Sequence, residues 1–205
     1  MTAPFGPPLI TCDLELEEAA RAVFSLASVL AQRADAVIVA AFGDPGADAL
    51  ANMLAKPVIG IAEAAMRIAA SGGRRFVVVT HTGQLVERMA RRAREIGLGE
   101  NCAGVLAAEG DPITLMANAA ALEGALKTLA GVEELGAEAV IVGDGLLGGV
   151  AKRLRGRVAA PLIEAIPAAV HHVAAALGAR YVAAQCRATG KVTNSSSPLL
   201  PSSHM

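Results

Sequence analysis

An internal repeat constrains the fold of this chain more than any other feature. Residues 34–39 (ADAVIV) align with residues 137–142 (AEAVIV) at an offset of 103, and one inserted residue later KPVI at 56–59 aligns with APLI at 160–163. Each copy predicts a buried strand, a glycine-containing loop, a helix, a second strand and a loop that enters another helix. Two such units predict two similar lobes with a ligand cleft between them.

Strands and helices alternate along the rest of the chain. A helix is expected from Asp13, as N-cap, to residue 34, because acids fill its first turn and apolar residues recur at helical spacing. Apolar runs without polar alternation, such as RRFVVVT and CAGVLAA, are typical of parallel strands buried on both faces. We therefore expect an α/β fold of two pseudo-symmetric lobes, each a parallel sheet flanked by helices. Residues 1–71 with 165–190 would form the first lobe and 72–164 the second, with 191–205 as a disordered tail.

Composition argues against several classes of function. Aromatic residues make up only 2% of the 205 residues and the net charge is −1, which disfavours a nucleic-acid or anionic-membrane surface. No apolar run reaches the roughly 20 residues of a membrane-spanning helix, and the first residues do not resemble a signal peptide. Three cysteines without CxxC spacing predict reduced thiols in the cytoplasm. They match no metal-ligand pattern, and the adjacent His171 and His172 point about 100° apart on a helix, so no metal site is expected.

One basic cluster occurs, within the sequence ERMARRAREIG. Its helical spacing predicts a solvent-exposed face opposite an apolar one. The basic residues of this face are Arg88, Arg91, Arg92 and Arg94. The apolar side is formed by Leu85, Met89, Ala93 and Ile96.

Residues able to do chemistry gather where the predicted strands end. In parallel sheets, ligands collect at the carboxyl ends of the strands. The repeat places Ala41 and Asp144 at equivalent positions just after the first strand of each copy. Racemisation without a cofactor needs proton-transfer groups on both faces of the reacting carbon, so two facing strand ends would suit it.

A dinucleotide site is the competing interpretation of the second loop. Gly143, Gly145 and Gly148 match G-x-G-x-x-G after a strand, and Glu164 follows Gly143 by 21 residues, near where a ribose-binding acid would fall. Only one clear strand follows this pattern, however. The repeat also accounts for the glycines as the counterpart of the FGDPG loop at 42–46, which disfavours a dinucleotide.

Together, VIVAAFGDPGADAL and KPVIGIAEAAM, supported by RRFVVVT, GLGENCAGVLA, AEAVIVGDGLLGGVAKRL and PLIEAIPAAV, span residues from about Pro7 to Leu177. These motifs resemble the Asp/Glu/hydantoin racemase superfamily, and within it the hydantoin and allantoin racemases. The resemblance implies cofactor-independent racemisation at a carbon next to a carbonyl. It also implies a small polar amide, imide or carboxylate ligand bound between two α/β lobes, and a homo-oligomer.

The chain departs from the family at the reacting groups. The positions of the family's two catalytic cysteines correspond to Ala41 and Asp144, and the family's opening strand has no counterpart. A carboxylate at Asp144 could act as a single base if burial raised its pKa. Three functions therefore stay open: a racemase-type isomerase with altered chemistry, a one-base lyase or decarboxylase acting through Asp144, and a non-catalytic small-molecule-binding homologue.

The expected site combines the residues of these loops. The catalytic positions are Ala41 and Asp144, the first being that of a lost thiol. Several of the substrate-binding candidates also have structural interpretations, such as a turn or cap carboxylate for Asp44 and a first-turn helix acid for Glu63. The substrate-binding candidates are Phe42, Gly43, Asp44, Pro45, Gly46, Glu63, Thr80, His81 and Gly145.

Overall fold

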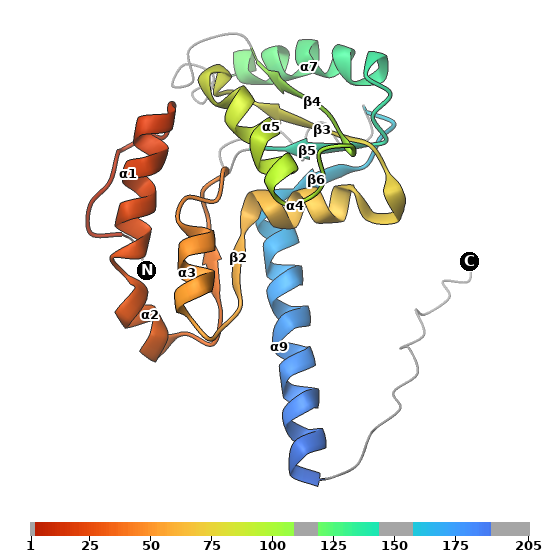
Figure 1. Cartoon of the computed structure of the whole chain (residues 1–205). Helices are drawn as coiled ribbons and strands as arrows, with labels where there is room; N and C mark the ends of the chain where they lie inside the picture. Colours follow the sequence, from red (N-terminus) through yellow and green to blue (C-terminus); the bar gives the residue numbers. More distant parts are fainter. Residues whose placement is uncertain (1–2, 109–118, 144–157, 190–205) are drawn as a thin grey trace.

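The computed structural model describes residues 3–108, 119–143 and 158–189, and it shows two parallel sheets flanked by helices (Figure 1). The smaller sheet pairs β1 (Val37–Val39) with β2 (Val58–Gly60). The larger sheet has the order β4-β3-β5-β6, formed by Cys102–Ala107, Phe76–Thr80, Ala139–Val142 and Leu162–Glu164. The predicted α/β class is thus confirmed, whereas Asp144, Gly145 and the tail at 191–205 lie outside the described residues.

Three helices accompany the smaller sheet on one side of the molecule (Figure 1). They are α1 (Asp13–Phe24), α2 (Ala27–Arg33) and α3 (Ala47–Met53). Their core is small and aliphatic, with Leu50 wholly buried among residues of α2, β1 and α3. The single helix predicted from Asp13 to residue 34 is wrong in detail, because the chain turns at 25–26 between α1 and α2 and the N-cap is Cys12.

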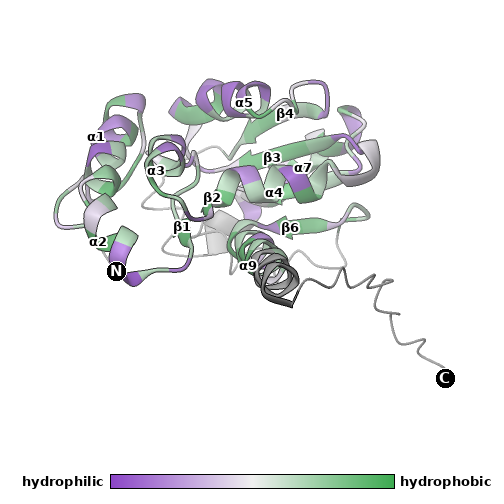
Figure 2. Cartoon of the chain, turned by 60° about the horizontal axis from the view of Figure 1, so that its bottom comes forward, coloured by the Kyte–Doolittle hydropathy of each residue, from purple (hydrophilic) through white to green (hydrophobic). Residues whose placement is uncertain are grey.

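The larger sheet is covered on both faces, which explains why its strands lack polar alternation. One face packs against α4 (Ile61–Ala69), α5 (Val86–Glu95) and α9 (Ala165–Thr189). The other face packs against α7 (Ala119–Glu134). All five residues of β3 are buried, and Figure 2 shows the apolar sheet strands beneath a polar outer face of α5. Two short 3₁₀ turns, Ser71–Gly73 and Gly83–Leu85, flank β3.

Helices α4 and α9 connect the two sheets. The buried side of α4 is mostly alanine (Ala62, Ala64, Ala65 and Ala69), so its backbone can lie close to its neighbours. Helix α9 contacts α4, both strands of the smaller sheet, and β6, and its far end extends away from the body in Figure 1. Because these helices touch both sheets, the lobe boundary at 71/72 stays a prediction.

The repeat is visible in the hydrogen bonding of the backbone. Val37 donates its N–H to the carbonyl of Pro57 at 2.9 Å, and Val140 donates to Pro161 at 3.0 Å. Val37 lies opposite Val58 in the first pair, and the equivalent Val140 lies opposite Leu162 in the second. The two strand pairs therefore have the same register. The alignment made from sequence is therefore confirmed as two equivalent strand pairs.

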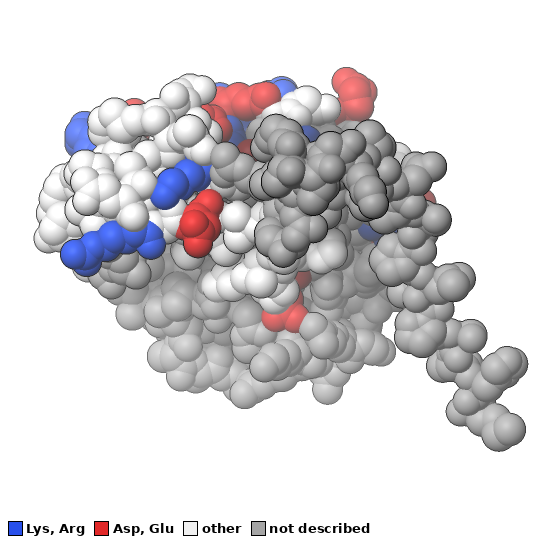
Figure 3. Space-filling view, turned by 90° about the horizontal axis from the view of Figure 1, so that it is seen from below, with Lys and Arg blue, Asp and Glu red and all other residues white. Residues whose placement is uncertain are grey.

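The described surface shows no membrane-spanning element. No helix in the described part of the chain combines the length and hydropathy needed to cross a bilayer. On the face seen in Figure 3, basic and acidic side chains are interspersed with uncharged ones.

Candidate functional site

The loop that follows β1 is tightly folded. The Asp44 N–H donates to the carbonyl of Ala41 at 3.1 Å, and Asp44 itself has a positive φ of 54°. Gly43 and Gly46 also have positive φ values, of 107° and 72°. A side chain on Gly46 would place its Cβ 2.9 Å from the carbonyl oxygen of Ala20, so glycine is required there for two reasons. The FGDPG sequence is thus explained locally by its backbone.

The Asp44 side chain turns away from solvent and caps α4. Its two carboxylate oxygens accept the N–H groups of Ala62 and Glu63, each at 2.8 Å, and the side chain is 0% exposed. A carboxylate at a helix N-terminus is favoured by the free N–H groups and the helix dipole. Burial raises the pKa of Asp44, while these two N–H groups and Arg92 act in the opposite direction. A Cβ on Gly60 would lie only 2.1 Å from the Asp44 carboxyl carbon, so this glycine makes room for the cap.

Arg92 of α5 is a buried side chain at the centre of an ion-pair network whose carboxylates range from the wholly buried Asp44 to Asp48, which is 70% exposed. Its guanidinium makes two hydrogen bonds to Asp48, at 2.7 and 3.0 Å, and one to Glu63 at 3.1 Å. Its Nε lies 3.4 Å from the Asp44 carboxylate. Burial alone would lower the pKa of Arg92, but these carboxylates raise it above its ordinary value, so the guanidinium is charged. Glu63 also pairs with Arg67 at 2.8 Å.

The expectation of a solvent-exposed basic face is wrong for Arg92, which is 6% exposed. The helical spacing contains the signal that was missed. Arg92 lies three residues after Met89 and four before Ile96, so it shares the inward stripe of the helix. Its basic neighbours Arg91 and Arg94 are exposed, as expected.

A buried polar turn follows the central strand β3. The Thr80 and Thr82 hydroxyls lie 2.8 Å apart, and the Thr82 N–H donates to the Thr80 hydroxyl oxygen at 3.1 Å. The Thr80 carbonyl accepts the N–H of Ala108 at 2.7 Å. His81, between them, is 2% exposed. Buried polar side chains are stable only where they have hydrogen-bond partners, which the Thr80–Thr82 pair illustrates.

The two loops related by the repeat meet at this same edge. A Cβ built on Gly143 would lie 3.3 Å from the Phe42 ring, 2.8 Å from Val78 and 3.1 Å from the carbonyl oxygen of Val79. The Gly143 N–H donates to that carbonyl at 2.8 Å. Phe42 directly follows Ala41, so its ring brings the start of the first loop beside Gly143, where the second loop begins.

The predicted site residues therefore divide into two groups. Phe42 lies against Gly143, between Ala41 and Gly43 in the chain, while Thr80 ends the strand adjacent to β5 and His81 follows it. By contrast, Asp44 and Glu63 direct their carboxylates to α4 and Arg92. Pro45 is buried and Gly46 is half-buried within the turn. Asp144, Gly145 and the rest of the G-x-G-x-x-G pattern lie outside the described residues.

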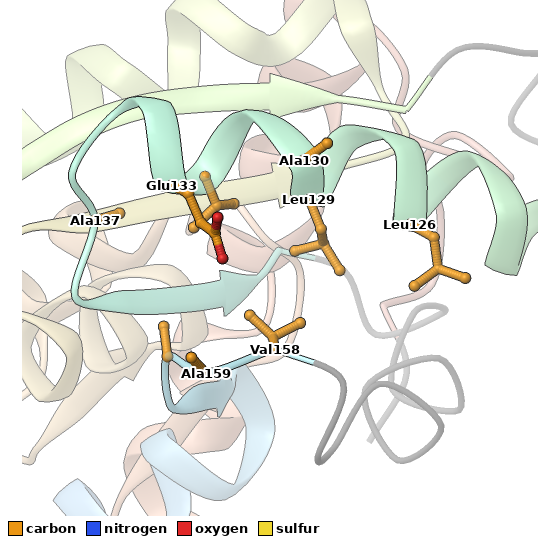
Figure 4. Close-up of a pocket in the computed structure, with 9 residues that line it drawn as sticks. Leu126, Leu129, Ala130, Glu133, Ala137, Val158 and Ala159 are labelled. Carbon is orange, nitrogen blue, oxygen red and sulfur yellow. The ribbon is translucent and has the colours of Figure 1, made fainter.

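A cavity of about 300 Å³ lies elsewhere, on the α7 face of the larger sheet. Figure 4 shows Leu126 and Leu129 of α7 on one side and Val158 with Ala159 on the other. Its one charged lining residue is Glu133, and it contains none of the predicted site residues. We therefore do not assign the site to this cavity.

Cys102 does not provide an alternative reactive thiol. Burial raises the pKa of the Cys102 thiol, which disfavours the nucleophilic thiolate. Cys12 begins α1. Within residues 3–108, 119–143 and 158–189, no group of three or more His, Cys, Asp and Glu side chains could hold a metal ion.

Comparison with known proteins identifies the family. A model described as Asp/Glu/Hydantoin racemase matches residues 1–173. The chain belongs to the Asp/Glu/hydantoin racemase family. It is 32% identical over 171 residues to a hydantoin racemase of Rhizobium meliloti, covering 82% of this chain and 68% of that protein. A hydantoin racemase of Paenarthrobacter aurescens is 32% identical over 144 residues, and the chain spans only 58% of its length.

A solved structure of the family supports the same assignment. The crystal structure of allantoin racemase from Pseudomonas fluorescens superimposes with a TM-score of 0.81 at 29% sequence identity. The match covers 88% of this chain and 77% of that one. The family resemblance seen in the sequence is thus confirmed, and these named relatives are racemases, which are isomerases.

Proposed function

We propose that this chain is a cofactor-independent isomerase of the racemase type with altered chemistry. Its substrate would carry an acidic carbon beside a carbonyl in a small polar amide or imide, in the class of 5-substituted hydantoins and allantoin. The observation that carries the proposal is the meeting of the two repeat loops at Phe42 and Gly143. The relatives named hydantoin and allantoin racemases support the substrate class.

The residues at the loop starts suggest one-base chemistry. Asp144 follows Gly143 in the sequence and would take the proton from the carbon, while the C–H electron pair passes into the adjacent carbonyl as an enolate. Return of a proton by the same carboxylate regenerates the original enantiomer, and the slower return of a proton from water to the opposite face of the planar enolate gives the inverted one. Ala41 has no ionisable group, so it cannot provide a base on the opposite face of the reacting carbon. We therefore expect hydrogen exchange to be faster than inversion.

Exchange in D₂O tests this proposal. Each enantiomer of a 5-substituted hydantoin and of allantoin is incubated with the protein, and the signal of the reacting C–H is followed by NMR while optical rotation reports inversion. Exchange is expected to be faster than inversion, with inversion following more slowly. Exchange at the rate of inversion would show a second base, and binding without exchange would support the non-catalytic homologue.

Matched variants locate the base. Asp144→Asn should abolish exchange, whereas Glu87→Gln, which changes an exposed carboxylate on α5, should leave it unaltered. A double variant, Ala41→Cys with Asp144→Cys, places thiols at both positions where the resemblance implies them and should convert exchange into racemisation. Decarboxylation of a substituted malonate by the unaltered protein would instead favour the lyase alternative.

Location and assembly remain predictions of the sequence. Sparse, unpaired cysteines favour the cytoplasm, and the family resemblance favours a homo-oligomer. Light scattering of the purified protein, which gives its mass in solution, tests the second.

A further inference from the structure

Four segments of the chain converge on one buried side chain. Arg92 projects from α5, and its guanidinium contacts Asp48 at the start of α3, Glu63 in the first turn of α4, and Asp44 in the loop after β1. Helix α5 itself packs on the larger sheet through Met89. The guanidinium therefore ties the larger sheet to the loop of the smaller one.

The geometry uses the shape of arginine and not only its charge. Both terminal nitrogens of the fork bind the two Asp48 oxygens, one of them also reaches Glu63, and Nε is directed to Asp44. A lysine ammonium is a single point charge and cannot span the same three carboxylates with one planar group. We expect the arrangement to depend on arginine at this position.

Removal of the guanidinium would leave three carboxylates without their shared cation, and of these Asp44 is wholly buried whereas Asp48 is 70% exposed. Asp44 would keep its two backbone N–H donors but lose its charged partner at a site with no solvent exposure. Breaking a buried ion pair at one partner is strongly unfavourable, because an uncompensated charge remains. The loop can relieve this by moving Asp44 outward, and Phe42, two residues away, would move with it.

We propose that Arg92 is a positioning residue for the candidate site: it holds the loop after β1 so that Phe42 stays against Gly143. This inference rests on the proposed function only where it predicts an effect of Arg92 on turnover. Arg92 lies on the Asp44 side of the loop, so it acts through Asp44 and not on the substrate.

Fluorine NMR tests the positioning without any substrate. The chain contains four phenylalanines, Phe5, Phe24, Phe42 and Phe76, so 4-fluorophenylalanine labelling yields four resonances that Phe→Leu variants assign. In Arg92→Lys and Arg92→Gln the Phe42 resonance should shift or broaden, more so in the glutamine variant. Phe76, the first residue of β3, is wholly buried in the core shared with α4, so it should stay in place and reports that the protein is folded.

The neighbouring arginine provides the matched control. Arg91 lies on the same helix but is exposed, so Arg91→Gln removes the same charge without touching the loop and should leave all four resonances unaltered. Unchanged Phe42 signals in both Arg92 variants would overturn the proposal. Arg92→Lys retains a charge at the site, and it provides the test if Arg92→Gln does not fold.

Turnover adds a second readout. If the wild-type protein exchanges the hydantoin C–H, Arg92→Lys should lower kcat for exchange by about 10- to 100-fold, the size expected for a misplaced reactive geometry. An unchanged kcat in Arg92→Lys would contradict the positioning role. If the wild-type protein exchanges no probe, the proposed function fails, while the Phe42 resonance still decides the role of Arg92.

Discussion

The two copies of the repeat pair their strands alike but begin their next helices differently. In both, the first strand donates an N–H to the carbonyl of a proline that precedes the second strand. In the first copy the second strand ends at Gly60, and α4 is capped by Asp44 from another loop. In the second copy Glu164 occupies the position of Gly60 and directly precedes α9.

The two copies thus share their strand pairing but differ in the residue that lies at the start of the following helix. In the first copy the strand ends at a glycine, Gly60, and the absence of a side chain there makes room for the carboxylate of Asp44. The second copy carries a carboxylate on the strand end itself. The first arrangement links the helix to a loop of the candidate site, and substitutions at the two entrances should therefore have unequal effects.

The largest effect is expected from Gly60→Ala. The new Cβ would lie within 2.1–2.5 Å of the Asp44 carboxylate atoms and would displace them from the cap and from Arg92. Loss of a buried, paired charge predicts a fall of about 3–5 kcal/mol in the free energy of unfolding, measured by urea titration. Glu164→Ala at the equivalent position adds no atom that must be accommodated, so we expect a smaller loss, of under about 1.5 kcal/mol. Equal losses of unfolding free energy in the two variants would contradict the proposed difference between the copies.

Asp44→Asn should have the next largest effect. An amide can present only one oxygen to the two N–H groups of Ala62 and Glu63, and it carries no charge for Arg92. We expect the free energy of unfolding, measured by urea titration, to fall by about 2–3 kcal/mol. One charge-assisted hydrogen bond is lost, and the amide NH₂ group faces a backbone N–H, so two donors oppose each other. The exposed Asp35→Asn provides the control and should be within about 0.5 kcal/mol of wild type.

Gly143→Ala tests the contact between the two loops. The added methyl group would lie 2.8 Å from Val78 and 3.1 Å from the carbonyl oxygen of Val79, so the second loop must shift away from Phe42. Overpacking of this kind predicts a loss of about 1–3 kcal/mol in a urea titration. Gly131→Ala within α7 finds an ordinary 3.5 Å contact and should be neutral or stabilising. A neutral Gly143→Ala would mean that the loops are not closely packed.

The smallest effect concerns Glu15, a half-buried carboxylate at a helix start, in contrast to the fully buried Asp44. Glu15 accepts hydrogen bonds from the Thr11 N–H at 2.6 Å and from the Thr11 hydroxyl at 2.8 Å, and these bonds lower the pKa of Glu15. A lowered pKa means that the stabilisation is present above the ordinary glutamate pKa of about 4.3 and is lost as the pH falls through the folded-state value. Glu15→Gln should therefore reduce the thermal midpoint slightly at pH 7, and the difference should vanish on acidification. A difference that persists in acid would exclude this origin.

Much of the fold could be predicted because it is encoded in local patterns. Apolar runs without alternation specify strands buried on both faces, and glycine with proline marks the loops between them. The equivalence of 34–39 with 137–142 placed two loops at the same edge, and Phe42 beside Gly143 agrees with it. The break between α1 and α2 was missed because residues 25–26 keep the helical spacing of their neighbours.

The candidate site was less predictable, because its organisation depends on contacts distant in sequence. Asp44 lies 18 residues before Ala62, and Arg92 lies 48 residues after Asp44. The spacing of Arg92 with Met89 and Ile96 indicates its direction but not the carboxylates that it meets.

The sequence by itself determined the α/β class, the repeat, the family and the loops that carry the candidate site. Each of these follows from residue types and spacing within one or two elements. Only the tertiary structure decided that Asp44 caps a neighbouring helix, that Gly60 makes room for it and that Arg92 is buried. A charged side chain is buried only where other segments supply its partners, because desolvation is otherwise too unfavourable, and those partners come together only when the chain is folded.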